Sequence, residues 1–239
     1  MYHQKMLVFL AALILGVTAF QPLTQNLAKT YDFPEKSYHG FIPINRTDSD
    51  ISKNTKTDGK DPNQMFYWWF PSRRSRENDP LVLWLTGGPG CSSELALFVE
   101  NGPFRINADS LELEINEWSW NREANVIYVD QPLGTGFSKV DQNHYVEDEE
   151  TVSKEMFDFL TKFIEKYPEF RGRDFYVTGE SYGGHYVPHI SNYLNKQLFS
   201  SNSDKKKFGV NFKGLTVGNG MINPWVQYEG YATFAYDNK

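Results

Sequence analysis

The sequence FYVTGESYGGHYVP, residues 175–188, decides the fold. It opens with a short apolar run typical of a buried strand, turns at Gly179–Gly184, and enters a helix that we predict over His185–Phe199. Residues 179–183 match Gly-x-Ser-x-Gly, in which a strained strand-to-helix turn lifts a serine hydroxyl to the top of a sheet. Ser181 is therefore the candidate nucleophile.

The spacing of the two glycines around Ser181 has a physical cause. Glycines two positions before and after the serine leave space where a side chain would meet the neighbouring strand and helix. The start of the following helix favours negative charge that develops nearby. A surface serine in a glycine turn is the alternative interpretation. The β-rich run before the turn and the helical run after it favour the nucleophile.

Composition narrows the class of protein. At 239 residues, with 40% hydrophobic side chains, the chain is long enough to bury a sizeable core in one domain. A formal net charge of -6 argues against a nucleic-acid partner. The short basic run Lys205–Lys207 follows a serine-rich stretch and predicts a solvated loop.

The N-terminus predicts a secretory signal peptide over residues 1–19. Lys5 precedes the apolar stretch Met6–Val17, and the small residues up to Ala19 suit cleavage. A membrane anchor is the alternative, but a stretch of this length is too short to span a bilayer stably. We therefore expect passage through the secretory pathway and no stable membrane anchor.

Residues 20–62 are polar and predict a propeptide, a linker or a long surface loop, followed by a domain over residues 63–239. Asn45 stands two positions before Thr47 in an N-glycosylation pattern. Asn45 is therefore the candidate glycosylation site.

Strands and helices alternate along the domain. Besides the stretch already described, we predict strands at Met65–Phe70, Leu81–Leu85, Asn125–Asp130 and Phe212–Val217, and helices at Ser93–Glu100 and Asp148–Tyr167. This alternation, with glycine-bearing loops at strand ends, indicates an α/β fold with a mostly parallel sheet. Ligands of such sheets lie at the carboxyl ends of the strands. We therefore expect the loops that start at Thr86, Gln131, Glu180 and Asn219 to gather there.

Several long strings resemble the serine carboxypeptidase family, particularly its plant-type members. They are WLTGGPGCSS (84–93), FVENGP (98–103), WSWNREANVIYVDQPLGTGFS (118–138), GESYGGHYVP (179–188) and GLTVGNGMINP (214–224). The resemblance begins near residue 31 and runs to the end. It implies an α/β-hydrolase fold, a vacuolar, lysosome-like or extracellular location, and removal of C-terminal amino acids from peptides, usually at acid pH. We expect no cofactor.

The resemblance assigns roles to individual residues. Ser181 matches the nucleophile, and the backbone N–H groups of Gly88 and Tyr182 match the oxyanion hole. This fits the independent expectation that the residue after the nucleophile supplies one donor and an earlier loop the other. Glu180 and Glu100 match a pair of carboxylic acids that binds the terminal carboxylate of the substrate. Two close carboxyls cannot both ionise cheaply, so one holds a proton at low pH and donates a hydrogen bond, whereas raising the pH repels the substrate.

The carboxylate-binding set also includes Gly87 and Thr86. Many family members have Asn where this chain has Thr86, which leaves the role of this shorter hydroxyl open. Some acyltransferase relatives share the threonine, but they usually have Asp in place of Glu180. Without the resemblance, Glu100 and Glu180 would be interpreted as two surface glutamates flanking loops.

The family also implies an Asp and a His after the nucleophile, and no histidine follows His189. His3, His39 and His144 precede Ser181, while His185 and His189 lie on a predicted helix that leads away from its hydroxyl. The i, i+4 spacing of this last pair suits a metal, but the glutamate of a His-Glu-x-x-His pattern is missing, so we predict no metal site. We hypothesise an N-terminal part of a serine carboxypeptidase that is inactive alone.

Cys91 is the only cysteine. An odd thiol in a secreted chain suggests a partner elsewhere, and a small buried thiol is the alternative. The resemblance implies that its disulfide partner lies in a missing C-terminal half, with which the chain would pair. Two other functions stay open. One alternative to a carboxypeptidase is a secreted non-catalytic binding or partner fragment. The other is an acyltransferase of the same family that uses the same acyl-serine.

Overall fold

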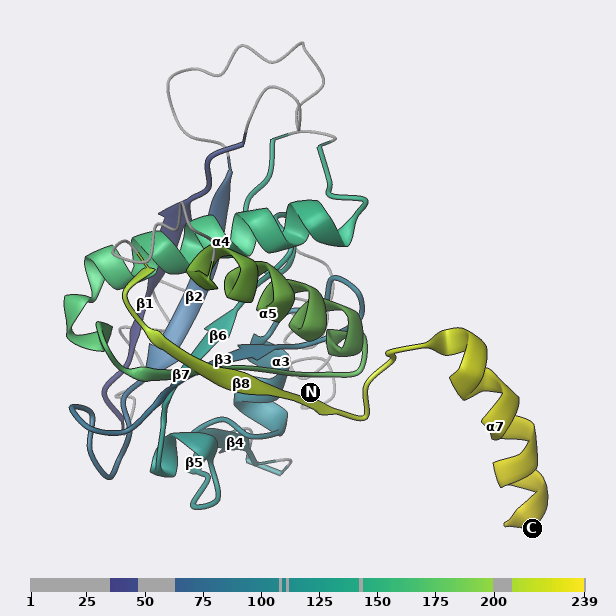
Figure 1. The fold of residues 1–239 in the computed structure, drawn as a ribbon. Helices are drawn as coiled ribbons and strands as arrows, with labels where there is room; N and C mark the ends of the chain where they lie inside the picture. Colours follow the sequence, from purple (N-terminus) through teal and green to yellow (C-terminus); the bar gives the residue numbers. More distant parts are fainter. Residues whose placement is uncertain are drawn as a thin grey trace.

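The computed structural model describes residues 35–46, 63–107, 109–110, 112–141, 144–199 and 208–238. The predicted signal peptide and the basic run at 205–207 lie outside the described residues. No helix within the described ranges combines the length and the apolar character needed to cross a membrane. Figure 1 shows a central sheet with helices on both faces and one further helix that lies apart from the body.

The sheet has six strands. Their spatial order is β1 (Tyr38–Pro43), β2 (Gln64–Phe70), β6 (Asn125–Val129), β3 (Leu81–Leu85), β7 (Asp174–Glu180) and β8 (Asn211–Gly218). β6, β3, β7 and β8 run parallel to one another. β1 pairs with β2, and β2 with β6, in the antiparallel sense. The predicted α/β fold with a mostly parallel sheet is confirmed.

Helices cover the two faces unequally (Figure 1). One face carries α4 (Glu149–Lys166) and α5 (Gly183–Phe199), and the other carries α3 (Glu94–Val99). The remaining elements are the hairpin β4 (Phe104–Ile106) and β5 (Leu113–Ile115), the short turns η2 (Trp120–Arg122) and η3 (Pro168–Phe170), and α7 (Pro224–Asp237). α7 has no buried residue.

Strand alternation divides the core into two layers. In β3, Leu81, Leu83 and Leu85 pack toward α4 and α5, while Val82 and Trp84 pack toward α3. Successive side chains of a strand point to opposite faces, which produces this division. The helix predicted at residues 148–167 is α4, and its apolar side chains recur at helical spacing and form a buried stripe, at Val152, Met156, Phe159, Leu160, Phe163 and Ile164.

Three features differ from the sequence prediction. Residues 38–43 lie in the segment expected to be a propeptide, linker or loop, yet they form β1, whose Tyr38 ring stacks on Trp69 at 4.4 Å. Gly40 and Pro43 interrupt the alternation of apolar and polar residues in this segment. The strand is therefore recognised from its pairing with β2 and not from its own sequence. The hairpin β4–β5 was not predicted, because its strands are too short to show an alternating pattern. α7 was not predicted either, because its apolar residues do not lie on one side of the helix.

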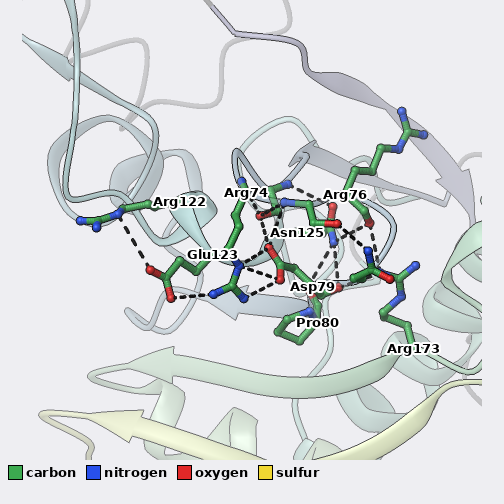
Figure 2. Close-up of polar contacts among 11 residues, drawn as sticks. Arg74, Arg76, Asp79, Pro80, Arg122, Glu123, Asn125 and Arg173 are labelled. Atoms are coloured by element: carbon green, nitrogen blue, oxygen red, sulfur yellow. Dashed lines mark hydrogen bonds and ion pairs between the residues drawn. The ribbon is translucent and has the colours of Figure 1, made fainter.

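A polar network closes the end of the sheet where the parallel strands begin (Figure 2). The Asn125 amide donates to the carbonyls of Arg76 at 3.2 Å and Asp79 at 3.1 Å, and Arg173 donates to the same two carbonyls at 3.1 and 3.0 Å. The Asp79 carboxylate accepts hydrogen bonds from Arg74 and Ser72, both at 2.5 Å. The network therefore ties the starts of β3, β6 and β7 together, at the end opposite the predicted site.

We expect Asp79→Asn to destabilise the protein by about 1.5–3 kcal/mol, because it removes charge-assisted hydrogen bonds. The hydrogen bond from Arg74 is the main factor that lowers the pKa of Asp79. A lowered pKa stabilises the fold above the ordinary carboxyl range, and this gain is lost as the pH falls. The difference in urea unfolding midpoint between the two proteins should therefore shrink on acidification.

Glu123→Gln is the matched control for Asp79→Asn. Glu123 contacts Arg74 at 3.2 Å, but both side chains are more than half exposed. Such surface pairs contribute about 0–1 kcal/mol. Equal destabilisation by the two substitutions would contradict a special role for Asp79.

Candidate active site

Ser181 stands in a strained turn between β7 and α5. Its φ is 58°, in the left-handed region that non-glycine residues seldom adopt. Three backbone hydrogen bonds hold it there: its N–H donates to the Gly218 carbonyl at 3.1 Å, and its carbonyl accepts from the N–H groups of Gly184 at 2.9 Å and Met221 at 2.8 Å. Ser181 is exposed. The loops after β7 and β8 thus present this hydroxyl to solvent.

The glycine spacing has the predicted physical cause. A Cβ on Gly179 would lie 2.5 Å from the Leu85 carbonyl oxygen and 2.9 Å from the Val187 side chain. These two atoms belong to the neighbouring strand β3 and to helix α5. α5 begins at Gly183, two residues earlier than predicted. The Gly-x-Ser-x-Gly pattern therefore reflects close packing of strand, turn and helix.

The turn after β3 touches the nucleophile turn directly. A Cβ on Gly87 would lie 2.4 Å from the Tyr182 backbone nitrogen and 2.9 Å from the Ser181 Cβ. The next residue, Gly88, is exposed and has a φ of 112°. The Cys91 N–H donates to the Gly87 carbonyl at 3.1 Å and closes the turn. Both predicted oxyanion donors, Gly88 and Tyr182, therefore belong to backbone segments in contact beside Ser181.

Glu100 and Glu180 come together although 80 positions separate them in the sequence. Glu100 directly follows α3 and Glu180 ends β7, and the two side chains are neighbours. Burial, followed by the charge of Glu180, raises the pKa of Glu100 to about 7. Two neighbouring carboxyls of this kind favour a proton on one of them. The two acids that the sequence predicted to act together are therefore neighbours in the structure.

Thr86 has a defined place in this site. Its hydroxyl oxygen accepts a hydrogen bond from the Trp84 indole at 3.0 Å, and its backbone N–H donates to Ser93 Oγ at 3.2 Å. The residue is buried, with 6% of its surface exposed. Thr86 therefore anchors the turn to β3, and its own O–H remains a donor.

The Tyr182 side chain contacts residues that sequence reasoning missed. Its hydroxyl lies near Glu149 at the start of α4, and its ring lies 4.7 Å from the His185 ring and 5.1 Å from the Tyr186 ring. The Tyr186 hydroxyl accepts from the Gly90 N–H at 3.2 Å. Burial raises the pKa of Glu149. No local spacing relates Glu149 to the site, because α4 reaches it only through tertiary packing.

The described histidines take part in other interactions. His39 lies on β1, with its ring 5.7 Å from that of Trp68, and His144 Nδ1 is 3.7 Å from Asp141. His185 and His189 are on α5, as predicted. In the part of the chain that the structure describes, no histidine is hydrogen-bonded to Ser181, and no group of three His, Cys, Asp or Glu side chains is placed to hold a metal.

Two remaining candidates are at the surface. Cys91 is exposed and its thiol is free within the described residues, which does not fit the alternative of a small buried thiol. Asn45 is also exposed, and its backbone N–H donates to Asp158 at 2.8 Å.

Comparison with known proteins agrees with this geometry. The family model described as serine carboxypeptidase matches residues 29–239. Serine carboxypeptidase-like 48 of Arabidopsis thaliana is 49% identical over 175 residues, which cover 73% of this chain and 33% of that protein. Serine carboxypeptidase S10 family member 1 of Dictyostelium discoideum is 47% identical over 173 residues, which cover 72% of this chain and 40% of that protein. The chain thus spans about a third of the length of the plant relatives that it matches.

A solved carboxypeptidase structure is also similar to this chain. The crystal structure of Kex1(delta)p, a prohormone-processing carboxypeptidase from Saccharomyces cerevisiae, has a TM-score of 0.70 and 36% identity. The match covers 85% of this chain and 42% of that one. Because the family model extends over most of the sequence, including the turns around Gly87 and Ser181, the chain belongs to the serine carboxypeptidase family.

Proposed function

We propose that this chain carries the nucleophile and the carboxylate-binding acids of an enzyme that releases C-terminal amino acids from peptides. The contact between Glu100 and Glu180 is the main observation behind this proposal, because Glu180 directly precedes Ser181. An exopeptidase must hold a terminal carboxylate one residue away from the bond that it cleaves. A protonated carboxyl next to the nucleophile supplies a hydrogen bond for that purpose.

The proposed reaction proceeds through an acyl-serine. Ser181 Oγ attacks the carbonyl carbon of the last peptide bond, a base takes the hydroxyl proton, and that proton passes to the leaving amine. Water then hydrolyses the ester and regenerates the serine. The backbone N–H groups of Gly88 and Tyr182 donate to the oxyanion of each tetrahedral intermediate. Contact of the Gly87 turn with Tyr182 supports this assignment.

We infer that the chain alone does not complete this reaction. Within the described residues no histidine bonds to Ser181, so the Asp and His that the family implies would come from further polypeptide. β8 has β7 as its only partner among the described strands, and α7 exposes Trp225 at 83% and Phe234 at 70%. Unpaired strand edges and apolar patches of this kind favour association. We propose that a C-terminal half packs here and carries the disulfide partner of Cys91.

We also propose that the protein passes through the secretory pathway to a vacuole, a lysosome-like compartment or the exterior, with a glycan on Asn45. The exposure of Asn45 supports the modification. Removal of N-linked glycans should lower the mass of protein secreted from eukaryotic cells, and Asn45→Gln should abolish that change. An unchanged mass in the wild type would argue against glycosylation.

Labelling with a fluorophosphonate probe, read by intact mass, tests the nucleophile. We expect no labelling of the chain alone, since no base activates Ser181. Fusion to the C-terminal segment of a plant relative should give labelling, and Ser181→Ala should abolish it. Labelling of the chain alone at Ser181 would contradict the requirement for added residues. Turnover of glucose esters in preference to peptides by the fusion would identify an acyltransferase.

Binding of a peptide with a free C-terminus should weaken as the pH rises through about 7, the pKa of Glu100. Above that pH both glutamates are charged and repel the carboxylate, and we expect a loss of about tenfold, equivalent to about 1.4 kcal/mol. Glu100→Gln keeps a donor at every pH and should flatten the dependence. Calorimetry measures the peptide affinity of the wild type and of Glu100→Gln at each pH.

An amidated peptide and the Glu165→Gln variant are the controls for this titration. The amidated peptide lacks the carboxylate, so its affinity should not show the same pH dependence. Glu165 is exposed on α4, and its substitution should leave the wild-type profile unchanged. Equal pH dependence for the free and amidated peptides would contradict carboxylate binding by the pair.

A further inference from the structure

A second pair of carboxyl groups, Glu94 and Asp130, lies beside the turn that carries Gly88. Glu94 begins α3 and is 1% exposed, while Asp130 directly follows β6 and is 0% exposed. The two side chains are neighbours, and within the described residues no donor reaches the buried Glu94 Oε1. A buried carboxyl oxygen that has no donor and lies beside a second carboxyl favours the protonated form of one of the two groups.

Asp130 connects two loops. Its Oδ1 accepts from the Ser93 N–H at 3.0 Å, and its Oδ2 accepts from the Phe137 N–H at 2.8 Å. A Cβ on Gly136 would lie 2.1 Å from Oδ2, so the backbone packs directly against this carboxylate. One carboxylate therefore holds the start of α3 against the loop that follows β6.

Ser93 connects Asp130 to the turn that follows β3. We call this turn, residues 86–93, the oxyanion turn. Its hydroxyl donates to the Val129 carbonyl at 2.7 Å and accepts from the Thr86 N–H at 3.2 Å. Thr86 is followed directly by Gly87 and Gly88. A continuous series of hydrogen bonds thus runs from Asp130 through Ser93 to the turn that contacts the nucleophile.

The surroundings of the pair determine which group keeps the proton. Burial, and then the charge of Asp130, raise the pKa of Glu94 well above its usual range. Burial also raises the pKa of Asp130, against hydrogen bonds from Glu94, Ser92 and the N–H groups of Phe137 and Ser93. Each carboxyl has the other as its main charged neighbour. Asp130, with more donors, is the ionised partner, and Glu94 holds the proton.

We propose that Glu94 and Asp130 share one proton and, in that state, act as positioning residues for the oxyanion turn, residues 86–93. Loss of the proton would leave two adjacent negative charges in the core, and their repulsion would separate the start of α3 from the loop after β6. The inference rests on the proposed function, because the position of this turn affects catalysis only if Gly88 binds the oxyanion.

Thermal unfolding of the full chain against pH tests the shared proton. A raised pKa stabilises the fold at low pH, and this stability is lost as the pH rises through the pKa of the folded protein. The melting temperature should therefore fall as the pH rises above the ordinary carboxyl range. Glu94→Gln keeps a donor toward Asp130 and should show a smaller fall. Glu100 contributes equally to both proteins, so the difference between them reports on Glu94.

Glu117→Gln is the matched control, because Glu117 is exposed and its variant should follow the wild type. An identical fall in melting temperature for Glu94→Gln and the wild type would overturn the shared proton.

Hydrogen exchange of peptides covering residues 86–93 tests positioning. At about pH 5, Asp130→Asn should lower the protection of the Thr86 and Cys91 amides about tenfold, the loss expected for one hydrogen bond to a charged group. At a pH high enough to remove the shared proton, the wild type should lose this protection while Glu94→Gln keeps it. The second comparison does not depend on the folding of Asp130→Asn.

Unchanged protection in the wild type at high pH would overturn the positioning role. Equal loss of protection in the wild type and in Glu94→Gln would also overturn it, because the loss would then have another cause. Neither measurement requires peptide binding or a reactive Ser181. A failure of the proposed carboxypeptidase function would therefore be seen separately from a failure of this inference.

Discussion

The site depends on a backbone contact between Gly87 and residues 180–182. β3 and β7 are parallel neighbours with Leu85 opposite Gly179, so the turns that follow them leave the sheet side by side. A side chain at position 87 would overlap the Tyr182 nitrogen, which means that only glycine allows this approach. The contact puts the segment of Gly88 against that of Ser181, and the sheet register maintains it.

The same contact brings the acidic side chains of Glu100 and Glu180 close together. α3 follows the Gly87 turn and is capped by Glu100, and β7 ends at Glu180, so the two carboxyls meet at the edge of the site. Each is half-buried, and mutual repulsion then favours a shared proton. Glu94 and Asp130 repeat this arrangement in the core at the other end of α3. A short helix thus lies between two pairs of acids, and we propose that each pair makes the site sensitive to pH.

Local patterns predicted those parts of the fold whose cause is local. The apolar runs of β3 and β7, the stripe of α4 and the glycine spacing around Ser181 are all visible within a few residues. β1 was missed because its pairing with β2, and not its own sequence, makes it a strand. α7 was missed because its apolar residues surround the helix and show no buried face.

The candidate site, like the fold, was only partly predictable from local sequence patterns. The turn at Ser181 follows from its residues alone, whereas the pairing of Glu100 with Glu180 was expected only through family resemblance. Contacts such as that of Glu149 with Tyr182 arise from packing between distant segments, and no spacing in the sequence encodes them.

The titration of Glu100 tests most directly whether the fold forces a shared proton beside the nucleophile. Nuclear magnetic resonance of protein with carbon-13-labelled glutamate carboxyls gives the pKa, with the resonance assigned from Glu100→Gln. Titration near 7, moving lower when Glu180 is replaced by Gln, is the predicted result. A pKa of about 4.3, the ordinary value for a solvated glutamate, would contradict the account.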